Sequence, residues 1–523
     1  MASRRDELNA YIFAKKRTVA AFLQPTPSGT EEGAPRPLRA VLPGVVVGAL
    51  ILAGFGAWGM FKPVAPKGWD DVASHVVVGS DSTTRYVVLK TDGKVQLHPV
   101  LNFASAKLLL DPDKSSIVKV KESELDNGHI PRGPTIGIPY APDRLPSAEE
   151  AKKQMEWAVC EQPGGNGKTT QKAVFLFSDR DPKLKKLHGS QALHSGQALY
   201  VEDKQGARYV VDPKGTKYLI GGPDLKKTSP STYSLLLRTV FRDGAKPQRV
   251  TNDWLATFRD GKPITFPDIP GTVGADAGVP SLGEKANRVG MVLETSTGNA
   301  KQHYVVLKGK VERISQFVAK LLLASEDLDD LGQKNRPEQV RPSSFVSDEE
   351  EFYGDDYNWP DEIPAQANSV DPELGSSARD TSCSVLRGVS GKGDPKTATW
   401  AGRDFPATIP DGATSAYVTP GSGVLFRQVQ GHQVKNGSVF LVTDTGLRYA
   451  VQSNNDSDAR KSKIGAEPDD KSTANAAQQN PEEAKQRLGY KEVNPVPVPD
   501  TWSEFLPRGP RLDKNSARQP QGS

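Results

Sequence analysis

Length, composition and charge limit the classes of protein that this sequence can encode. The chain has 523 residues, enough for two or more packed domains. A charged fraction of 25% and a hydrophobic fraction of 36% suit a mainly water-exposed protein and argue against many membrane spans. The net charge of +4 is small, and no Lys/Arg stripe alternates with aromatic residues, so nucleic acid is not an expected partner.

Residues 1–39 predict a tail that contains one amphipathic helix. Leu8, Ile12, Val19 and Phe22 fall near one helical face. The basic residues around this face are Arg4, Arg5, Lys15, Lys16 and Arg17. Such a helix could lie on an anionic membrane surface or pack on a partner subunit. The alternative is a frayed helix that contacts nothing.

Residues 40–61 predict a single transmembrane helix. No charged residue occurs in these 22 positions, and roughly 20 apolar residues span a hydrocarbon core of about 30 Å. A buried core helix of this length would show a polar edge, and a signal peptide would not follow a tail of 39 residues. Gly44 and Gly48 form a GxxxG pattern that permits close helix packing, although the pattern also arises by chance in a glycine-rich span.

Two features favour a tail inside the cytoplasm and residues 62–523 outside it. The tail holds seven Lys/Arg residues against four acids, although the bias close to the span is weak. The only two cysteines, Cys160 and Cys383, both follow the span. An isolated pair fits a disulfide in an oxidising compartment, and two unrelated buried thiols are the alternative.

The loop GGNGKTT, residues 164–170, resembles a phosphate-binding loop at first sight. A Walker loop reads G-x-x-x-x-G-K-[ST] and opens a helix, but Gln162 stands where the first glycine is needed. The following run, 173–177, predicts a strand and not a helix. A polar turn between two strands therefore explains the loop without nucleotide.

No other segment carries a strong chemical motif. The seven histidines form no HExxH pattern, so neither a catalytic nor a metal-ligating residue is assigned. Residues 348–362 hold eight acids in 15 positions but lack the spacing of an EF-hand loop. A solvated loop is expected there, and cation binding is the alternative.

Two segments after the span align without a gap, YVVDPKGTKYLI at 209–220 and FLVTDTGLRYAV at 440–451. Alternating apolar residues around a polar glycine turn predict a β-hairpin in each. Looser copies begin at Tyr86 and Tyr304, and both continue into a helix-like run ending in AKLLL. The residues common to the two aligned segments are Gly215 and Gly446, then Tyr218 and Tyr449.

A second element recurs after two of the hairpins, at 254–264 and 502–512, with a tryptophan followed by a glycine seven positions later. The region after the span therefore predicts four related units that start near residues 76, 199, 293 and 424. Each is expected to contain a hairpin, a short helix and a returning strand; coincidence among common YVV strands is the alternative. Residues 452–485 are polar and free of aromatics, which predicts a mobile insertion.

The opening RRDELNAYIFAKKRTVAAFL, the single span, and the motifs DNGHIPRGPTIGIPYAPDRLP and LGYKEVNPVPVPDTWSEFLPRGPRL occur together. In this combination the chain resembles the EccB membrane component of the actinobacterial type VII (ESX) secretion system over nearly its whole length. The resemblance implies an α+β fold: a short cytoplasmic amphipathic helix, one transmembrane helix, and a large extracytoplasmic domain of four pseudo-repeats around a central domain. It also implies that Cys160 and Cys383 are the family's disulfide pair.

The resemblance further implies a structural subunit that scaffolds the export channel on the outer side of the cytoplasmic membrane. Its partners would be other membrane subunits in an oligomeric assembly, including a multi-span component and a motor ATPase. No cofactor is expected for that role. An ATPase activity has been attributed to the family, so an extracytoplasmic ATPase that binds ATP is one alternative, and a cell-wall-binding membrane anchor is another.

Overall fold

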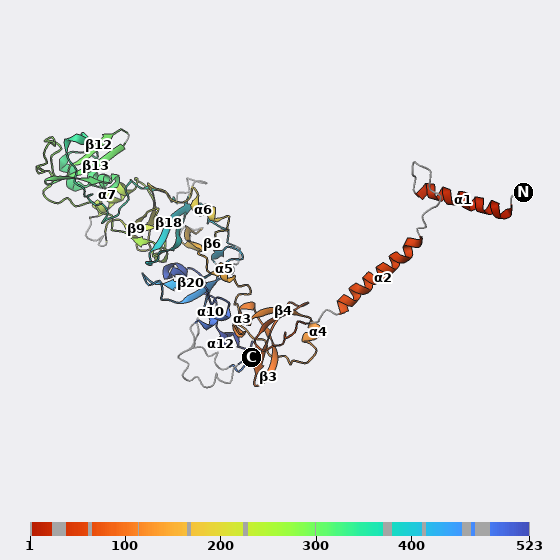
Figure 1. Ribbon diagram of the computed structural model, residues 1–523. Coiled ribbons are helices and arrows are strands. Elements are labelled where there is room, and N and C mark those ends of the chain that lie inside the picture. Colours follow the sequence, from red (N-terminus) through yellow and green to blue (C-terminus); the bar gives the residue numbers. More distant parts are fainter. Residues whose placement is uncertain are drawn as a thin grey trace. The chain divides into compact units, whose positions relative to one another are not determined.

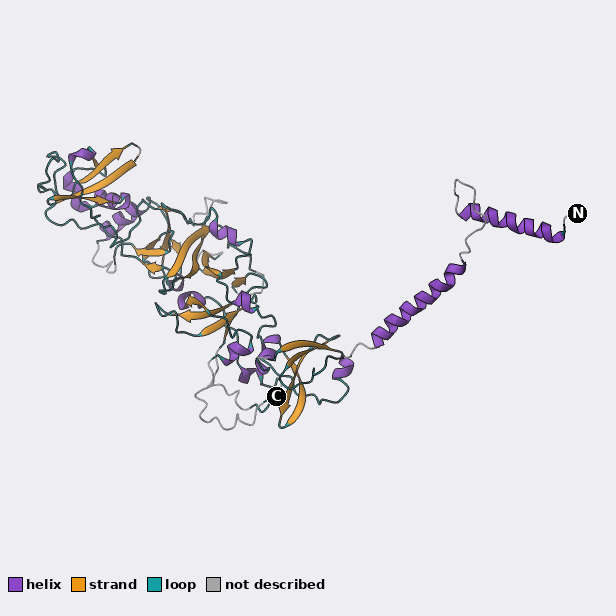
Figure 2. Ribbon diagram, in the orientation of Figure 1, coloured by secondary structure: helices purple, strands orange, loops and turns teal. Residues whose placement is uncertain are grey.

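The computed structural model describes residues 3–23, 38–60, 65–112, 114–164, 169–222, 229–298, 300–369, 379–409, 415–451, 462–465 and 482–521. The chain divides into two compact units, Met1–Lys67 and Gly68–Ser523. The first unit contains two helices, α1 (Arg4–Leu23) and α2 (Leu38–Met60), which are the first two labelled in Figure 1. The second unit contains small sheets and short helices (Figure 2).

Helix α1 forms where the tail helix was predicted. Its first turn carries Asp6 and Glu7, which interact favourably with the positive end of the helix dipole. The predicted apolar face is interrupted by a charge, because Lys15 follows Ile12 by three residues and precedes Val19 by four. Apolar and charged side chains are therefore mixed around this helix, which is less amphipathic than the sequence pattern suggested.

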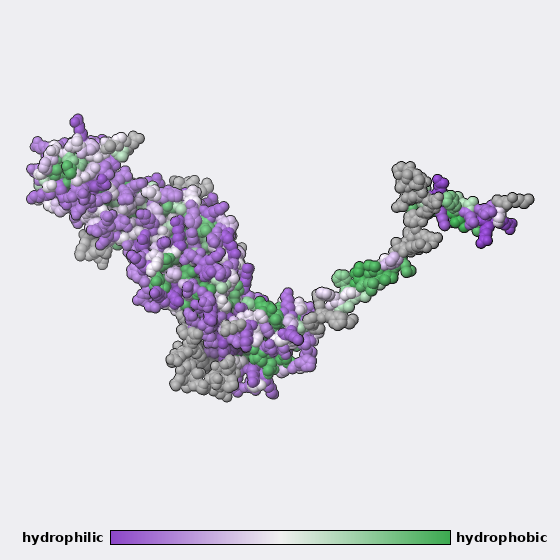
Figure 3. Space-filling model, viewed as in Figure 1, coloured by the Kyte–Doolittle hydropathy of each residue, from purple (hydrophilic) through white to green (hydrophobic). Residues whose placement is uncertain are grey.

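Helix α2 matches the predicted span. Val41–Gly59 is long and apolar enough to cross a membrane, and none of that stretch is buried against other parts of the chain. Figure 3 shows α2 as a continuous hydrophobic rod. An all-round apolar helix of this kind is stable when lipid or other apolar helices surround it.

A central sheet organises the second unit. Its strand order is β18-β17-β5-β6-β19, with only β19 parallel to its neighbour. The strands are β5 (Glu156–Pro163), β6 (Thr170–Phe177), β17 (Thr381–Val389), β18 (Pro395–Gly402) and β19 (Ala416–Val418). More than 200 residues separate β6 from β17 in the chain, and this long excursion contains two of the four remaining sheets.

The four remaining sheets follow one topology. Three antiparallel strands form a meander, a helix crosses over, and a fourth strand returns parallel to the first. A crossover is required because two parallel strands cannot be joined by a tight turn. The sequence predicted four repeats, and these are confirmed. It predicted a hairpin in each unit, whereas the structure has a third meander strand.

The elements of the first and second of these sheets are as follows. The first has β1 (His75–Gly79), β2 (Arg85–Thr91), β3 (Lys94–Val100), α3 (Phe103–Leu109) and β4 (Ser116–Val120). The second has β7 (Gln197–Glu202), β8 (Arg208–Val211), β9 (Thr216–Leu219), α7 (Pro230–Val240), β10 (Gln248–Arg249), β11 (Arg259–Asp260) and, on β7, β16 (Ala365–Gln366).

The third and fourth sheets repeat this order. The third has β12 (Val292–Thr297), β13 (Ala300–Leu307), β14 (Lys310–Ile314), α9 (Gln316–Ala324) and β15 (Glu338–Gln339). The fourth has β20 (Val424–Val429), β21 (Val439–Val442), β22 (Arg448–Ala450), α10 (Glu483–Arg487) and β23 (Val496–Pro499).

Short helices complete the described elements: α4 (Glu122–Leu125), α5 (Ala148–Ala151), α6 (Leu184–His188), α8 (Asn252–Leu255), η2 (Glu326–Leu331), η3 (Pro342–Ser344), α11 (Asp500–Ser503) and α12 (Lys514–Ala517).

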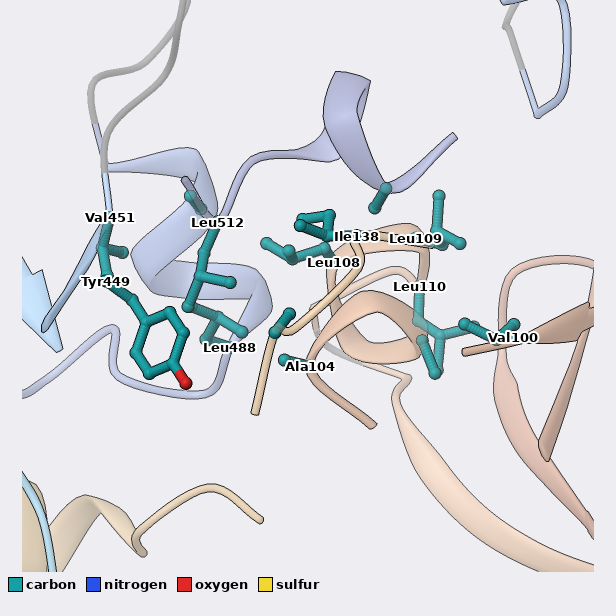
Figure 4. Close-up of a cluster of buried hydrophobic side chains, with 14 of the residues drawn as sticks. Val100, Ala104, Leu108, Leu109, Leu110, Ile138, Tyr449, Val451, Leu488 and Leu512 are labelled. Atoms are coloured by element: carbon teal, nitrogen blue, oxygen red, sulfur yellow. The ribbon is translucent and has the colours of Figure 1, made fainter. Parts of the chain in front are cut away.

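The hydrophobic cores join sheets that are far apart in the sequence. We call each of these four sheets with its crossover helix a repeat, numbered in chain order. Side chains of the first repeat, including Leu108 and Leu110 of the α3 region, share a core with Tyr449 and Leu512 of the fourth repeat (Figure 4). The second and third repeats share another core. Among the described residues, the core of the first repeat is therefore completed by the fourth repeat and contains no side chain of the second.

Most of the predicted insertion, residues 452–461 and 466–481, lies outside the described residues. The parts that are described are not loose. Ile464 is buried in the core shared by the first and fourth repeats and forms a β-bridge with Thr91. Helix α10 begins at Glu483, inside the predicted insertion. The polar composition of 452–485 gave no sign of the buried Ile464 or of helix α10.

Candidate functional site

The predicted contact residues of the tail lie on an open helix surface. Leu8, Ile12, Val19 and Phe22 expose between 40% and 89% of their area. Tyr11 and Phe13 are exposed as well, and they lie outside the predicted set. Exposed large apolar side chains at this density mark a surface that binds protein or lipid. The assignment of these residues as partner or membrane contacts stays a prediction.

Gly44 and Gly48 lie on one face of α2, one turn apart. Among the described residues, no atom lies within 4 Å of the position that a Cβ would take at either glycine. This face is therefore open for the close approach of another helix. Packing at these glycines stays a prediction.

The disulfide between Cys160 and Cys383 links two neighbouring strands of the central sheet. Cys160 of β5 stands directly opposite Cys383 of β17, and both are fully buried. The bond closes a loop of 223 positions, which in the chain-entropy account stabilises the fold by about 4–5 kcal/mol. The sequence left this pairing open, and the sheet register explains it.

The glycine-rich loop joins two paired strands. Residues 165–168, which include Lys168, lie outside the described residues. On either side, β5 and β6 are antiparallel, and Pro163 pairs with Thr170. The backbone N–H of Gly164 donates to the carbonyl of Thr169 at 2.7 Å. The loop therefore connects the two strands of a hairpin. A Walker loop needs a different geometry, because it must lead into a helix whose N-terminus faces the phosphates.

The acidic stretch 348–362 is anchored by its aromatic residues. Its acids are exposed, but Trp359 is buried and its indole N–H donates to the carbonyl of Lys262 at 3.1 Å. The Tyr353 hydroxyl accepts from the backbone N–H of Asp268 at 3.0 Å, and burial raises the pKa of Tyr353 to about 12. Within the described residues, no group of three or more His, Cys, Asp or Glu side chains could hold a metal ion.

The two repeated sequence elements meet in space. Tyr218 lies against Gly261 in the second repeat, and Tyr449 lies against Gly509 in the fourth repeat. A Cβ at position 509 would come within 2.6 Å of the Tyr449 ring. The tyrosine of the hairpin and the glycine after the tryptophan therefore form one contact, made twice. The sequence displayed both elements but not their pairing.

A buried carboxyl group follows Cys160 on the disulfide-bearing strand β5. Glu161 of β5 is fully buried and accepts hydrogen bonds from the hydroxyl and the backbone N–H of Thr251. The Nζ atom of Lys172 lies 3.9 Å from Oε1 of Glu161. Removal from water raises the pKa of Glu161 despite these partners. Nothing in the sequence around Glu161 indicated this environment.

Together these features define a class of protein: a single-span membrane protein whose large domain is built from four related sheets around a disulfide-linked sheet. The sequence matches, over residues 1–522, the family described as type VII secretion system ESX-1, transport TM domain B. The chain belongs to this family.

Two relatives illustrate the range of the similarity. The ESX-1 secretion system ATPase EccB1 of Mycolicibacterium smegmatis (strain MKD8) is 27% identical over 429 residues, 79% of each chain. The ESX-3 secretion system ATPase EccB3 of Mycobacterium tuberculosis (strain H37Rv) is 26% identical over 510 residues, 92% of this chain and 82% of the relative.

Solved structures share the fold. A chain of the intact ESX-5 inner membrane complex superposes with a TM-score of 0.56 at 20% identity, covering 100% of this chain and 96% of that one. A chain of the EccB3 dimer from the ESX-3 core complex gives a TM-score of 0.55 at 22% identity, covering 85% of this chain and 99% of the other.

Proposed function

We propose that this chain is a structural subunit of a type VII secretion membrane complex, which holds other subunits around the export path. Family membership supports this function, and the solved structures of similar fold are an intact ESX-5 inner membrane complex and an EccB3 dimer from the ESX-3 core complex. The observation that carries it is the exposure of apolar side chains along both α1 and α2, because such surfaces are stable when protein or lipid covers them. The partners are other membrane subunits, among them a multi-span component and a motor ATPase.

Copurification tests this role. The tagged full chain, extracted from native membranes in mild detergent, should bring a multi-span subunit and a motor ATPase with it in a fixed ratio, as read by mass spectrometry. Recovery of the chain alone, together with retention on isolated peptidoglycan, would contradict the scaffold and favour a cell-wall anchor.

The proposed orientation places residues 1–39 in the cytoplasm and residues 62–523 outside it. The basic tail supports this orientation, and so does the disulfide, which persists in an oxidising compartment. Protease added to spheroplasts should trim the chain to a small tail-plus-span fragment. A large domain that is cut only after membrane lysis would reverse the orientation.

ATP hydrolysis is a second candidate function, because the relatives are named ATPases. The hairpin that carries residues 164–170 favours the scaffold over this alternative. Phosphate release by the purified full chain, compared with Lys168→Ala, separates the two. Hydrolysis that disappears in Lys168→Ala would establish the second function, and equal rates at background level would remove it.

A further inference from the structure

A hollow of about 610 Å³ lies beside the C-terminal end of α7, the helix labelled near the third sheet in Figure 1. One wall holds Phe241 and Arg242, and Lys320 of α9 forms another. The extended segment 363–369 and Arg379 complete it. The hollow therefore joins elements of the second and third repeats with the segment that leads to β17.

The charged side chains among the described lining residues are of one sign. Arg242, Lys320 and Arg379 line it, and none of its described lining residues is acidic. The Arg379 guanidinium donates to the carbonyl of Ser190 at 3.5 Å. Lys320 is half-buried, and burial lowers its pKa. Among the described residues, no carboxylate offsets this effect. A cation partly removed from water is stabilised when an anion binds beside it.

The position of Lys320 is a repeated one. Lys320 stands five residues after the N-cap Ser315 of α9, and Lys107 stands five residues after the N-cap Asn102 of α3. Burial lowers the pKa of Lys107 in the same way, and Lys107 also lines a hollow, of about 420 Å³. Only the Lys320 hollow adds two guanidinium groups. The lysine therefore belongs to the repeated sequence pattern, whereas Arg242 and Arg379 add positive charge only at the hollow beside Lys320.

Within the wall formed by 363–369, the last residue, Ser369, pairs with Arg379, whereas β16 has one backbone edge with no partner among the described strands. The backbone N–H groups of Ala365 and Ala367 donate to the carbonyls of Gly196 and Ala198, at 2.7 and 2.8 Å. The main-chain groups of Gln366, which lies between them, point away from β7 by the alternation of a strand. Among the described strands, β16 pairs with β7 alone. Extended peptides bind by adding a strand to such an edge.

We propose that this hollow binds an extended acidic polypeptide segment. Its main chain lies along the edge of β16, and its carboxylates pair with Arg242, Lys320 and Arg379. Arginine suits this task because its fork of donors matches a carboxylate. The binding does not depend on the scaffold function, and it can be measured on the isolated full chain.

The test uses the full chain in detergent and a short fluorescein-labelled peptide of alternating glutamate and valine, followed by anisotropy. We expect binding that weakens with salt. Lys320→Met and Arg242→Met should each weaken it about tenfold or more, as expected for a lost charge-assisted contact. Methionine keeps the apolar stem, so the melting temperature should not fall. The control Lys204→Met removes an exposed lysine elsewhere on the second repeat, and this variant should bind the peptide as the wild type does.

Several results would overturn the proposal. The first is no binding of the acidic peptide by the wild type. Equal binding of a glutamine–valine peptide would show that charge is not read. Equal affinity in Lys320→Met, Arg242→Met and the wild type would place the peptide elsewhere. Inorganic polyphosphate that binds tightly and depends on these residues, where the peptide does not bind, would assign the hollow to phosphate anions.

Discussion

The two compact units of this chain treat apolar side chains in opposite ways. Helices α1 and α2 leave nearly all of theirs exposed to the surroundings of the chain, whereas the unit Gly68–Ser523 buries its own in several cores. The second unit is stabilised by interactions within itself: packed cores, a disulfide and the repeated tyrosine–glycine contact. We expect the first to be stabilised by protein or lipid that covers its exposed apolar side chains. Substitutions should therefore abolish function in the first unit and lower stability in the second.

The largest expected effect is in α1. Ile12→Asp places a charge in the contact that we assign to this helix, at a cost of several kcal/mol if the site is desolvated. Export should stop and the chain should leave its complex, while its abundance and the unfolding of its second unit stay normal. Secretion assays and native gels measure these outcomes. Ala14→Asp is the control, since Ala14 is exposed on the side of α1 opposite Ile12.

Normal export by Ile12→Asp would break the comparison. So would a block of export by Lys168→Ala with Ile12→Asp unaffected, because the glycine-rich loop would then carry the function.

The disulfide should give the largest effect on stability. Replacing both Cys160 and Cys383 with alanine removes a cross-link over 223 positions, and about 4–5 kcal/mol of unfolding free energy should be lost. Denaturant unfolding of the purified full chain measures this loss. Wild-type chain unfolded and refolded in reductant should match the double variant. In oxidising conditions the wild-type thiols should resist alkylation, and ready alkylation of native protein would contradict the bond.

The repeated tyrosine–glycine contact should give an intermediate effect. A methyl group at Gly509 meets the Tyr449 ring, and one at Gly261 meets the Tyr218 ring. Overpacking of this kind costs about 1–3 kcal/mol, so Gly509→Ala and Gly261→Ala should each destabilise the second unit by that amount. Gly283→Ala is the control, because no described atom lies within 4 Å of its Cβ position. Equal stability of all three variants would show that the contact is dispensable.

The smallest effect concerns Glu161, whose pKa burial raises. The unfolded carboxyl loses its proton near pH 4.3, but the folded one holds it to higher pH. Stability is therefore full below the unfolded pKa and falls as pH rises through the folded pKa. Glu161→Gln should raise the melting temperature slightly at about pH 7 and leave it unchanged at about pH 4. A drop at pH 7 would mean that the charged form is the stabilising one.

Local patterns carried much of the prediction. The span was visible because 22 consecutive positions lack charge, and the repeats were visible because the spacing of Gly215 and Tyr218 recurs at Gly446 and Tyr449. The two-residue strands β10, β11 and β15 were invisible, since they are too short to show any alternation. The Lys320 hollow was invisible for another reason: its three cations are scattered over 138 positions of the chain.

The sequence by itself determined the span, the approximate repeat positions, the candidate cysteine pair and the family, because each is written in composition or in spacing along the chain. Only the tertiary structure decided that the first repeat shares its core with the fourth, that Tyr449 contacts Gly509, and that Cys160 pairs with Cys383 on the neighbouring strand. These are contacts between distant segments. They form when apolar area is buried jointly, and no periodicity within one segment records which distant surface will cover it.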